Sequence, residues 1–513
     1  MPFERSAGIL LHPTSLPSPG GIGDLGPEAY AFADFLASAR QGLWQILPLS
    51  PPGLNNSPYS AISAFAGNPL LISLERLAEH GWIEPRDLDG LPPWRDRVDF
   101  EEVKSHKLPL LRRGAQSFLE KDHSHRGRFE DFKQQNAWWL EDFVLFEVAR
   151  EVYSGDAWSS WPREIARREP EGLHQFGLKR QRELEVERAI QFAFFEQWRA
   201  LRRYCSNRGI RIVGDVAIFV NYDSADVWRY PELFYLDEKL LPTVVAGVPP
   251  DAFSESGQRW GNPLYRWELC RQSGYQWWTE RMSWALATCD IVRLDHFRGF
   301  ESYWEIPASE TTAIHGRWVK GPGDELFHVL RERLGDLPFV AEDLGMITTE
   351  VHALRERLAI PGMKVLQFAF GDPGSHIYLP HNYPDNCVVY TGTHDNDTTL
   401  GWWQTGASAE ERTHAQAYLG GTADVPWEFI RAAYTSVGRL AIVPFQDVLS
   451  LGSEARMNLP SRPDGNWGWR FAAGATRREM AERLAGLSTM CDRLPRVSSS
   501  QQGHGEVRED FAA

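Results

Sequence analysis

Short apolar segments rich in β-branched and aromatic residues recur along the chain, and each ends in polar or glycine-rich residues. Between several of them lie segments whose apolar residues repeat with the helical period of about 3.6. Strands that alternate with helices predict parallel βαβ units. The predicted strands are residues 8–15, 43–50, 210–220, 290–299, 339–345, 364–370, 388–397 and 440–449.

Eight strands of this kind predict an α/β protein with a closed (β/α)8 barrel, the TIM barrel, and an open doubly wound sheet is the alternative. Two intervals, 51–209 and 221–288, are too long for ordinary connections between strands two and three and strands three and four. We therefore predict large, mainly helical insertion subdomains there. Residues 1–495 are expected to form one catalytic domain, and the polar, aperiodic residues 496–513 a disordered tail.

The chain has 513 residues and a formal net charge of −15. An acidic surface repels phosphate groups, so we expect neither nucleic acid nor an anionic membrane as a partner, and a neutral or cationic substrate. The five cysteines are scattered and lack CxxC spacing, which argues against a disulfide framework and a zinc site. With no secretory signal and no membrane-spanning segment in the pattern, we expect a cytoplasmic protein.

Aromatic residues are abundant, with 21 Trp, 27 Phe and 15 Tyr. Many lie beside turn residues and polar groups, as in "QRWGNPLYRW" and "LGWWQTG". Aromatic rings stack on the C–H faces of sugars, but large hydrophobic cores also use them. Composition alone leaves both interpretations open.

Carboxylates follow the predicted strands. In a barrel, the carboxyl ends of the strands meet on one face, where active sites lie. A single aspartate there could be a structural ion pair with a neighbouring Arg or His, but several together indicate catalysis. The carboxylates at these positions are Asp215, Asp295, Glu342, Asp343, Asp395 and Asp447.

Two carboxylates facing a neutral substrate suggest acetal chemistry, in which one attacks the sugar and a protonated one donates to the leaving oxygen. Arg293 precedes Asp295 by two residues, so both point to one face of a strand, and the cation favours an ionised nucleophile. Glu342 follows the apolar segment "PFVA", and burial there would raise its pKa as a general acid requires. Its neighbour Asp343 should point the other way, into the structure.

The motifs "RLDHFRG", "VAEDLG" and "TGTHDNDT", in this order, resemble the α-amylase superfamily. More narrowly, the chain resembles the 4-α-glucanotransferases of glycoside hydrolase family 77, the amylomaltase or disproportionating-enzyme type. The likeness covers nearly the whole chain. It includes the segments "GILLHPTSLPSPGGIGDLG", "SPYSAISAFAGNPLLI", "GDVAIFVNYDSADVW", "GVPPDAFSESGQRWGNPLYRW" and "MNLPSRPDGNWGWR".

This resemblance implies retaining transfer of a segment of an α-1,4-glucan, such as amylose or a maltooligosaccharide, to the 4-hydroxyl of an acceptor sugar. No cofactor is evident, and the histidines lack HExxH or paired spacing, so we expect no metal. It implies that Asp295 is the nucleophile, Glu342 the general acid/base and Asp395 a third carboxylate that binds sugar hydroxyls. The expected substrate-binding residues are Tyr59, Asp215, Asp251, Gln258, Trp260, Arg293, His394 and Asn466. The chain departs from the family near Gly374, where a segment is shorter, which puts a sugar contact by Asp372 in doubt.

The carboxylates alone do not separate a transferase from an α-1,4-glucan hydrolase, because water and a sugar hydroxyl can both resolve a glycosyl-enzyme. The segment 246–260 combines Pro249 and Pro250 with a glycine hinge and Trp260, which favours a lid that excludes water; an ordinary surface loop is the alternative. A non-catalytic glucan-binding protein would have lost one of the three acids, but all three are present. A phosphate-using enzyme would need a glycine-rich anion loop at the start of a helix, and the sequence shows no convincing one.

Overall fold

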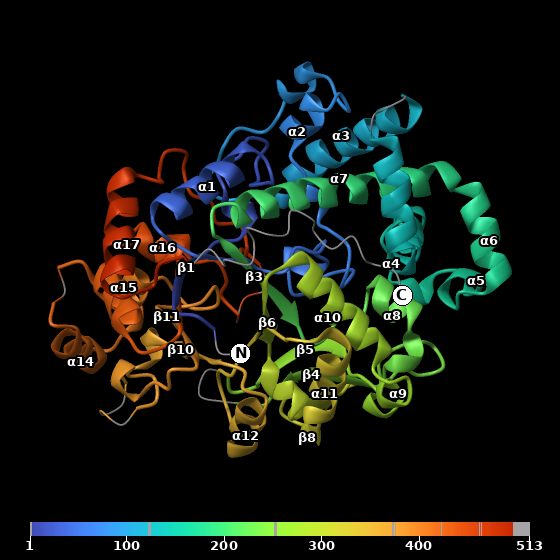
Figure 1. The fold of residues 1–513 in the computed structure, drawn as a ribbon. Helices are drawn as coiled ribbons and strands as arrows, with labels where there is room; N and C mark the ends of the chain where they lie inside the picture. Colours follow the sequence, from blue (N-terminus) through green and yellow to red (C-terminus); the bar gives the residue numbers. More distant parts are fainter. Residues whose placement is uncertain are drawn as a thin grey trace.

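The computed structural model describes residues 3–121, 125–250, 254–371, 374, 376–421, 423–460, 462 and 464–495. Its eight parallel strands close into a barrel, and each overlaps one of the predicted strands, so the barrel is confirmed and the open sheet is wrong (Figure 1). In order around the barrel they are β1 (Ser6–Leu10), β2 (Leu43–Gln45), β3 (Arg211–Ala217), β6 (Ile291–Asp295), β9 (Phe339–Ala341), β10 (Gly362–Val365), β11 (Cys387–Tyr390) and β12 (Leu440–Pro444).

The pairing of β3 with β6 places the functional side chains. The two strands run parallel with Asp215 opposite Arg293 and Ala217 opposite Asp295. Because side chains alternate between the faces of a strand, Asp215, Arg293 and Asp295 share the same side of the sheet. The apolar residues between them, such as Leu294, are buried, which explains why the strand reads as an apolar segment.

The connection from β2 to β3 is helical, as predicted. Its last helix, α7, packs against α3 and α4, runs across the upper part of Figure 1 and leads into β3. Aromatic rings fill the space between these helices, with Trp82 and Phe118 stacked at 4.1 Å between ring centroids. The helices are α2 (Leu74–Glu79), α3 (Phe100–Glu120), α4 (Arg126–Val152), α5 (Arg163–Ala166), α6 (Pro170–Lys179) and α7 (Gln181–Ser206).

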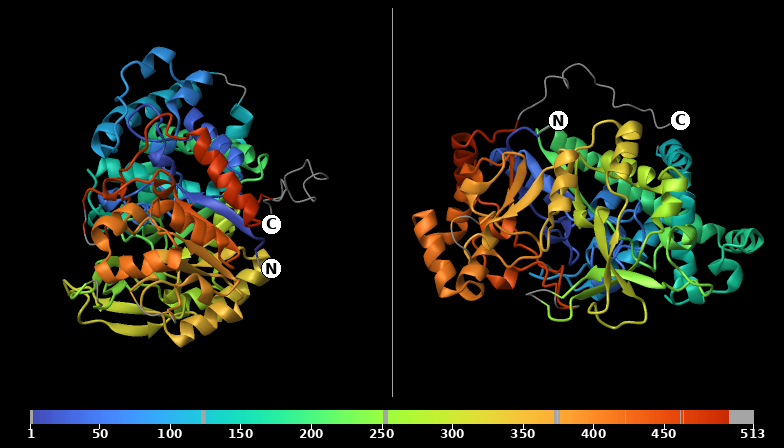
Figure 2. Two further views of the ribbon diagram at one scale, coloured as in Figure 1. Left: turned by 90° about the vertical axis from the view of Figure 1, so that its left-hand side faces the viewer. Right: turned by 90° about the horizontal axis from the view of Figure 1, so that it is seen from below.

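The connection from β3 to β6 contains helices but also two strands that the sequence pattern did not reveal. They are α8 (Ala225–Arg229), β4 (Val244–Val248), β5 (Gln258–Pro263), α9 (Trp267–Gln272) and α10 (Gln276–Thr288). Strand β4 pairs antiparallel with β5 and with β7 (Ser302–Pro307), which pairs with β8 (Arg317–Lys320), so two connections share one small sheet (Figure 2). Short strands whose partners lie in another connection carry little local signal, so they were missed.

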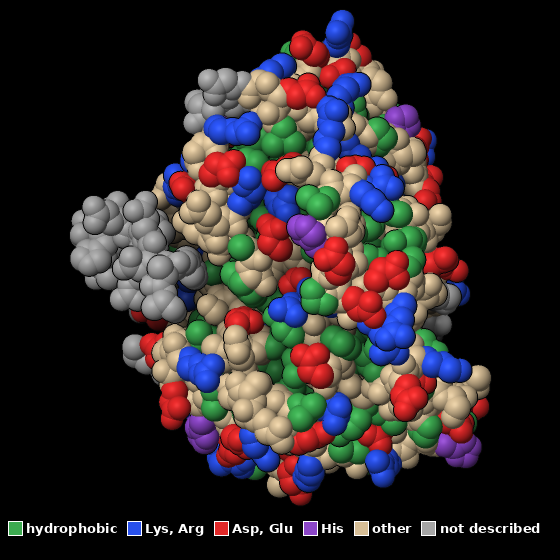
Figure 3. Space-filling model, turned by 90° about the vertical axis from the view of Figure 1, so that its right-hand side faces the viewer, with side chains coloured by type: hydrophobic (Ala, Val, Ile, Leu, Met, Phe, Trp, Pro, Cys, Tyr) green, Lys and Arg blue, Asp and Glu red, His purple; other side chains and the backbone are tan. Residues whose placement is uncertain are grey.

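The remaining helices cover the outside of the barrel. They are α1 (Pro27–Ser38), α11 (Asp324–Leu334), α12 (Thr349–Arg357), α13 (Thr399–Gly401), α14 (Ala409–Leu419), α15 (Val425–Thr435), α16 (Phe445–Val448) and α17 (Arg478–Met490). Acidic and basic side chains intermingle on the face drawn in Figure 3. Within the described ranges, no helix combines the length and the apolar character needed to cross a membrane. The predicted tail, 496–513, lies outside the described residues.

A buried glutamate in the helical insertion makes the stability of the fold depend on pH. Glu187 on α7 has a side chain that is 12% exposed, and Arg112 lies 3.7 Å from it. Burial, with the nearby charge of Glu147, raises the pKa of Glu187 to about 8 in spite of Arg112. A glutamate in an unfolded chain titrates near pH 4.3. The folded protein therefore holds the extra proton between these values, and its stability falls as pH rises from about 4.3 through about 8.

Glu187→Gln is expected to raise the melting temperature at pH 8 by roughly 1–2 °C and to leave it nearly unchanged at pH 5, because glutamine replaces the protonated form. Thermal unfolding of both proteins at the two pH values measures this. Glu185→Gln, at a more exposed site of the same helix with 32% of the side chain exposed, is the control and should show no such dependence on pH. The same temperature difference at pH 5 and pH 8 would contradict a protonated Glu187.

Candidate active site

Arg293 links two carboxylates of different exposure at the carboxyl ends of β3 and β6. Its Nη1 atom donates to both oxygens of Asp215 at 2.8 and 2.7 Å and lies 2.9 Å from Oδ1 of Asp295. The Asp215 side chain is fully buried, whereas 27% of the Asp295 side chain is exposed. Asp215 therefore holds Arg293 from the interior of the barrel, and Asp295 is the carboxylate of the pair that faces solvent.

The sequence predicted that Arg293 favours the ionised form of Asp295, but the net effect of the surroundings is to raise the pKa of Asp295. Burial raises the pKa of Asp295 to about 6; Arg293 opposes this, and the charges of Asp215 and Asp395 add to it. The neighbouring cation thus limits the rise without cancelling it, because two other carboxylates lie near. A carboxyl group with a pKa near 6 is still mostly ionised at pH 7, as a nucleophile must be.

Glu342 follows β9 and lies where its proton is retained. Its Oε2 accepts a hydrogen bond from the backbone N–H of His296 at 2.8 Å, and its Oε1 accepts one from Leu344 at 2.9 Å. Burial, and then the charge of Asp295, raise the pKa of Glu342 to about 7 against the effect of Arg293. Two neighbouring carboxyl groups with separated pKa values divide the roles of base and acid between them.

Asp343 points away from the site, as predicted. One of its oxygens accepts from the backbone N–H of Met363 at 2.7 Å, and the other lies 3.1 Å from Nε of Arg355. Asp343 is buried and ties β9 to β10 and α12. Adjacent carboxylates on an extended chain point to opposite sides, so only Glu342 reaches the site.

The turn after β6 is shaped around Glu342. His296 has φ 53°, in the left-handed region that residues other than glycine seldom adopt. In this conformation the N–H of His296 meets the Glu342 carboxylate, and the N–H of Phe297 donates to the Glu342 backbone carbonyl at 3.1 Å. A turn that contains a strained residue and donates two hydrogen bonds to the same glutamate is the kind of feature found at functional sites.

Asp395 follows β11 and stays ionised. Its oxygens meet Nδ2 of Asn458 at 2.6 Å and Nε2 of His394 at 3.3 Å. Burial opposes ionisation, but His394, Asn458 and Arg293 together outweigh it and hold the pKa of Asp395 well below its ordinary value. The side chain is 44% exposed, so an ionised acceptor faces the space in front of the barrel.

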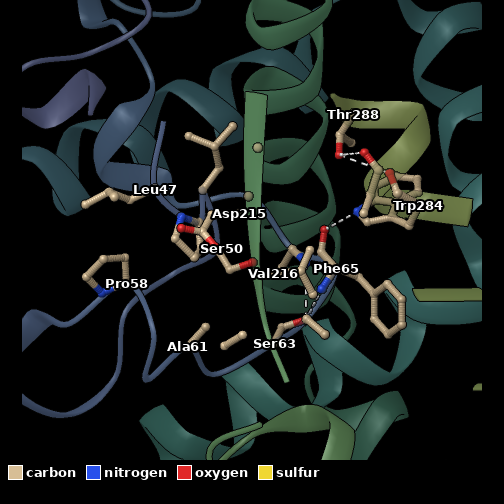
Figure 4. A pocket seen from close by; sticks show the side chains of 18 of the residues that line it. Leu47, Ser50, Pro58, Ala61, Ser63, Phe65, Asp215, Val216, Trp284 and Thr288 are labelled. Carbon is tan, nitrogen blue, oxygen red and sulfur yellow. Dashed lines mark hydrogen bonds between the residues drawn. The ribbon is translucent and has the colours of Figure 1, made fainter. Parts of the chain in front are cut away.

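Tyr59, in the segment after β2, contacts both Asp215 on β3 and His394 in the loop after β11. Its hydroxyl donates to Asp215 at 2.7 Å, and its ring stacks on that of His394 with centroids 5.2 Å apart. Beneath this segment lies a cavity of about 100 Å³ that reaches Asp215 and extends to Trp284 and Thr288 on the other side of β3 (Figure 4). Asp295, Glu342 and Asp395 do not line it, so this cavity is separate from the reacting groups.

The segment predicted as a lid is a β-hairpin, since β4 and β5 flank residues 249–257. Gln258 and Trp260 lie on β5, and Nε1 of Trp260 donates to Oε1 of Gln258 at 3.1 Å. The indole is 39% exposed and meets the ring of His296 edge-on at 4.8 Å, beside the end of β6. Both residues therefore belong to the site region. Asp251, predicted on the same segment, and Asp372 lie outside the described residues.

Two further sequence-predicted residues form hydrogen bonds with parts of the chain other than Asp295, Glu342 and Asp395. The side-chain amide of Asn466 forms hydrogen bonds with the backbone of its own loop, at Leu459 and Arg462, and its contact with glucan stays a prediction. Asp447 is fully buried and accepts hydrogen bonds from Thr391 and Thr399, so it supports the barrel from behind the site.

Sequence reasoning missed Asn458, whose side chain contacts the site. The segment "MNLPSRPDGNWGWR" contains two asparagines, and sequence reasoning chose the second, Asn466. The structure brings the first, Asn458, to Asp395. The sequence offered a signal, since the segment belongs to the resemblance, but nothing local distinguishes one asparagine from the other.

Comparisons with known proteins agree with this geometry. A family model described as 4-alpha-glucanotransferase matches residues 11–476. A 4-alpha-glucanotransferase of Thermus thermophilus is 49% identical over 504 residues, which cover 96% of this chain and 100% of that protein. A chloroplastic/amyloplastic 4-alpha-glucanotransferase of Solanum tuberosum is 44% identical over 482 residues, covering 92% and 83%.

Among solved structures, the amylomaltase from Streptococcus agalactiae in complex with acarbose is similar, with a TM-score of 0.93 and 37% identity over 96% of this chain and 100% of that one. These matches support transfer of glucan segments and not the hydrolase alternative. The family match, the sequence identities and the shared fold point to the same family. The chain therefore belongs to the 4-alpha-glucanotransferases of glycoside hydrolase family 77.

Proposed function

We propose that Asp295, Glu342 and Asp395 carry out 4-α-glucanotransfer in this chain by a retaining double displacement. The observation that carries the proposal is the pairing of a carboxylate that is mostly ionised at pH 7, Asp295, with a neighbour of higher pKa, Glu342, at the ends of β6 and β9. Retaining enzymes that break glycosidic bonds need this division between nucleophile and acid. Arg293, between Asp215 and Asp295, supports the role of Asp295.

In the first step, a carboxylate oxygen of Asp295 attacks the anomeric carbon of the donor glucan. The bond to the glycosidic oxygen breaks, and Glu342 gives its proton to that oxygen as the leaving chain departs. In the second step, the acceptor 4-hydroxyl loses its proton to Glu342, and its oxygen displaces Asp295 from the anomeric carbon. Glu342 is then protonated again, and the configuration of the sugar is retained.

Asp395 binds hydroxyls of the sugar whose bond is broken. An ionised carboxylate accepts strong hydrogen bonds, and such bonds to the hydroxyls of the reacting sugar would favour a distorted ring as the bond breaks. His394 and Arg293 help to hold that charge. Tyr59 contributes its ring beside His394 and its hydroxyl to Asp215.

The substrates we infer are neutral α-1,4-glucans, that is, maltooligosaccharides and amylose. The exposed aromatic ring of Trp260 and the open carboxylate of Asp395 supply the stacking and hydrogen-bonding groups that sugars require. We also infer a cytoplasmic location, supported by five cysteines that are all unpaired.

Incubation of the purified protein with maltotriose tests the proposed reaction. Transfer produces glucose together with a series of longer maltooligosaccharides, while the number of reducing ends stays constant. Chromatography of the products and a reducing-end assay measure both quantities. Reducing ends that increase with every bond cleaved would indicate hydrolysis and overturn the proposal.

Trp260→Ala is expected to reduce transfer more than bond cleavage, so that the ratio of hydrolysis to transfer rises several-fold. The indole lies beside His296 at the end of β6, where it can stack on an acceptor sugar and exclude water. Loss of an aromatic stacking partner costs roughly 1 kcal/mol or more. Glucose released from maltotriose, measured against longer oligosaccharides formed, gives the ratio.

Trp318→Ala is the matched control, because Trp318 lies on β8 of the same sheet and is also 39% exposed. Its ring lies against the guanidinium of Arg298 at 3.8 Å and meets the ring of Trp304 at 5.1 Å, away from the ring of His296 that Trp260 contacts. The control should partition the intermediate as the wild type does. If Trp260→Ala did the same at a temperature where it is folded, the hairpin would have no role in excluding water.

A further inference from the structure

We propose that Asn458, held by Arg456, is a positioning residue that orients Asp395 and keeps it able to bind sugar hydroxyls during transfer. The proposal rests on the role given to Asp395 in the proposed function. Neither residue was singled out by the sequence, and both lie after β12, far along the chain from the loop that they contact.

Three hydrogen bonds join this segment to the His394–Asp395 loop. The Asn458 side chain donates from Nδ2 to Oδ1 of Asp395 at 2.6 Å, and its backbone N–H donates to the carbonyl of His394 at 3.1 Å. Arg456 donates from Nη2 to the backbone carbonyl of Asp395 at 2.6 Å. The side chain and the backbone of Asp395 are thus both held, which fixes the direction of the carboxylate.

Arg456 also determines the conformation of Asn458 itself. Its Nε atom donates to the backbone carbonyl of Asn458 at 2.7 Å. One guanidinium therefore bridges the backbone carbonyls of Asp395 and Asn458. A planar group with several donors in a rigid arrangement suits such a bridge, and lysine could not replace it with the same geometry.

The segment is built against the site on its other side as well. Trp467 donates from its backbone to Met457 at 2.8 Å, and its ring lies 6.0 Å from that of His394 and 5.8 Å from that of Tyr59. Trp467 has φ 65°, a left-handed conformation that costs free energy for a residue with a side chain. Packing over the site compensates for this strain, so the segment is held in place from both ends.

The pattern of burial shows what this arrangement accomplishes. Asn458 is buried, at 8% exposure, whereas 44% of the Asp395 side chain is exposed. Asn458 occupies one position on Oδ1, and His394 approaches Oδ2, which leaves further lone pairs of the carboxylate for sugar hydroxyls. A buried donor thus supports an exposed acceptor.

An amide suits this role because its N–H donates at every pH. The charged and titratable groups around Asp395 are His394 on its own loop, Arg293 and Asp295 on β6, Tyr59 on the segment after β2, and Arg456. The help from His394 depends on its protonation, whereas that from Asn458 does not. Loss of the amide donor would therefore make Asp395 easier to protonate.

Asn458→Asp tests the proposal, because aspartate has nearly the same shape and lacks the donor. We expect kcat/KM for maltotriose to fall ten- to a hundredfold, mainly through kcat, since contacts to the reacting sugar strengthen in the transition state. Two carboxyl groups in contact share a proton at a raised pKa, so the acid limb of the pH profile, which Asp295 sets in the wild type, should move to higher pH. Asn207→Asp, at the exposed end of α7, is the control for the same chemical change and should match the wild type.

The outcomes separate this proposal from the proposed function. A wild type that forms no oligosaccharide series from maltotriose would contradict the function itself. A wild type that transfers, beside an Asn458→Asp variant with wild-type kcat/KM and an unmoved acid limb, would overturn only the role of Asn458. If the Asp variant does not fold, Asn458→Ala is measured below its melting temperature. The value of kcat decides there, because a merely structural role would lower the melting temperature without lowering kcat at a temperature where the variant is folded.

Discussion

Asp295→Asn is expected to abolish transfer in a protein that still folds. An amide cannot form the ester to the anomeric carbon, so turnover of maltotriose should fall by roughly 10⁴-fold or more. Folding should persist, because the neutral amide removes a partly buried charge that lies close to Asp215 and Asp395. Initial rates on maltotriose and thermal unfolding measure the two effects.

Asp385→Asn is the control for this substitution. Asp385 is exposed, and its carboxylate pairs with Arg439 at 2.9 Å on the surface, so the variant should turn over maltotriose as the wild type does. An Asp295→Asn protein that kept a tenth of the wild-type rate would show that another group attacks the sugar. Asp215 could not replace it, because its side chain is fully buried.

Glu342→Gln is expected to stop disproportionation of maltotriose but to spare formation of the glycosyl-enzyme from an α-glucosyl fluoride. Fluoride leaves without a proton, whereas a sugar hydroxyl needs one from Glu342. General acid catalysis of this kind contributes roughly 10²–10⁴-fold, so the rate on maltotriose should fall by that factor. Release of fluoride and of glucose from the two donors provides the comparison.

The pH profile of the wild type follows from the pKa values of Asp295 and Glu342. Glu342 acts in its protonated form, so activity on maltotriose should decline as pH rises through about 7, the value to which burial and Asp295 raise its pKa. Asp295 acts in its ionised form, so activity should also decline as pH falls through about 6. In the Glu342→Gln variant with the fluoride donor, the limb at higher pH should be absent.

Asp343→Asn distinguishes the acid from its neighbour. Asp343 pairs with Arg355 in the interior, so this variant should melt at a lower temperature and treat the two donors alike. Equal losses on both donors in Glu342→Gln would instead mean that Glu342 supports the structure. The two variants together therefore test the assignment of adjacent carboxylates to different roles.

Much of the barrel was predictable because its signal is local. Each strand is buried on both faces and so reads as a short apolar segment, and the residue at its carboxyl end is placed on the active face by the fold class alone. Asp295 and Glu342 follow from this reasoning. The shared side of Arg293 and Asp295 follows from the two-residue period of a strand.

The amino-acid sequence by itself determined the eight strands, the helical insertion after β2 and the carboxylates near the carboxyl ends of β3, β6, β9 and β11. Only the tertiary structure decided that β4 and β5 pair with β7 and that Asn458, not Asn466, reaches Asp395. It also decided that the pKa of Asp295 is raised in spite of Arg293. The physical reason is common to these cases: hydrophobic periodicity acts between near neighbours in the chain, whereas strand partners, hydrogen-bond donors and electric fields come from segments that only folding brings together.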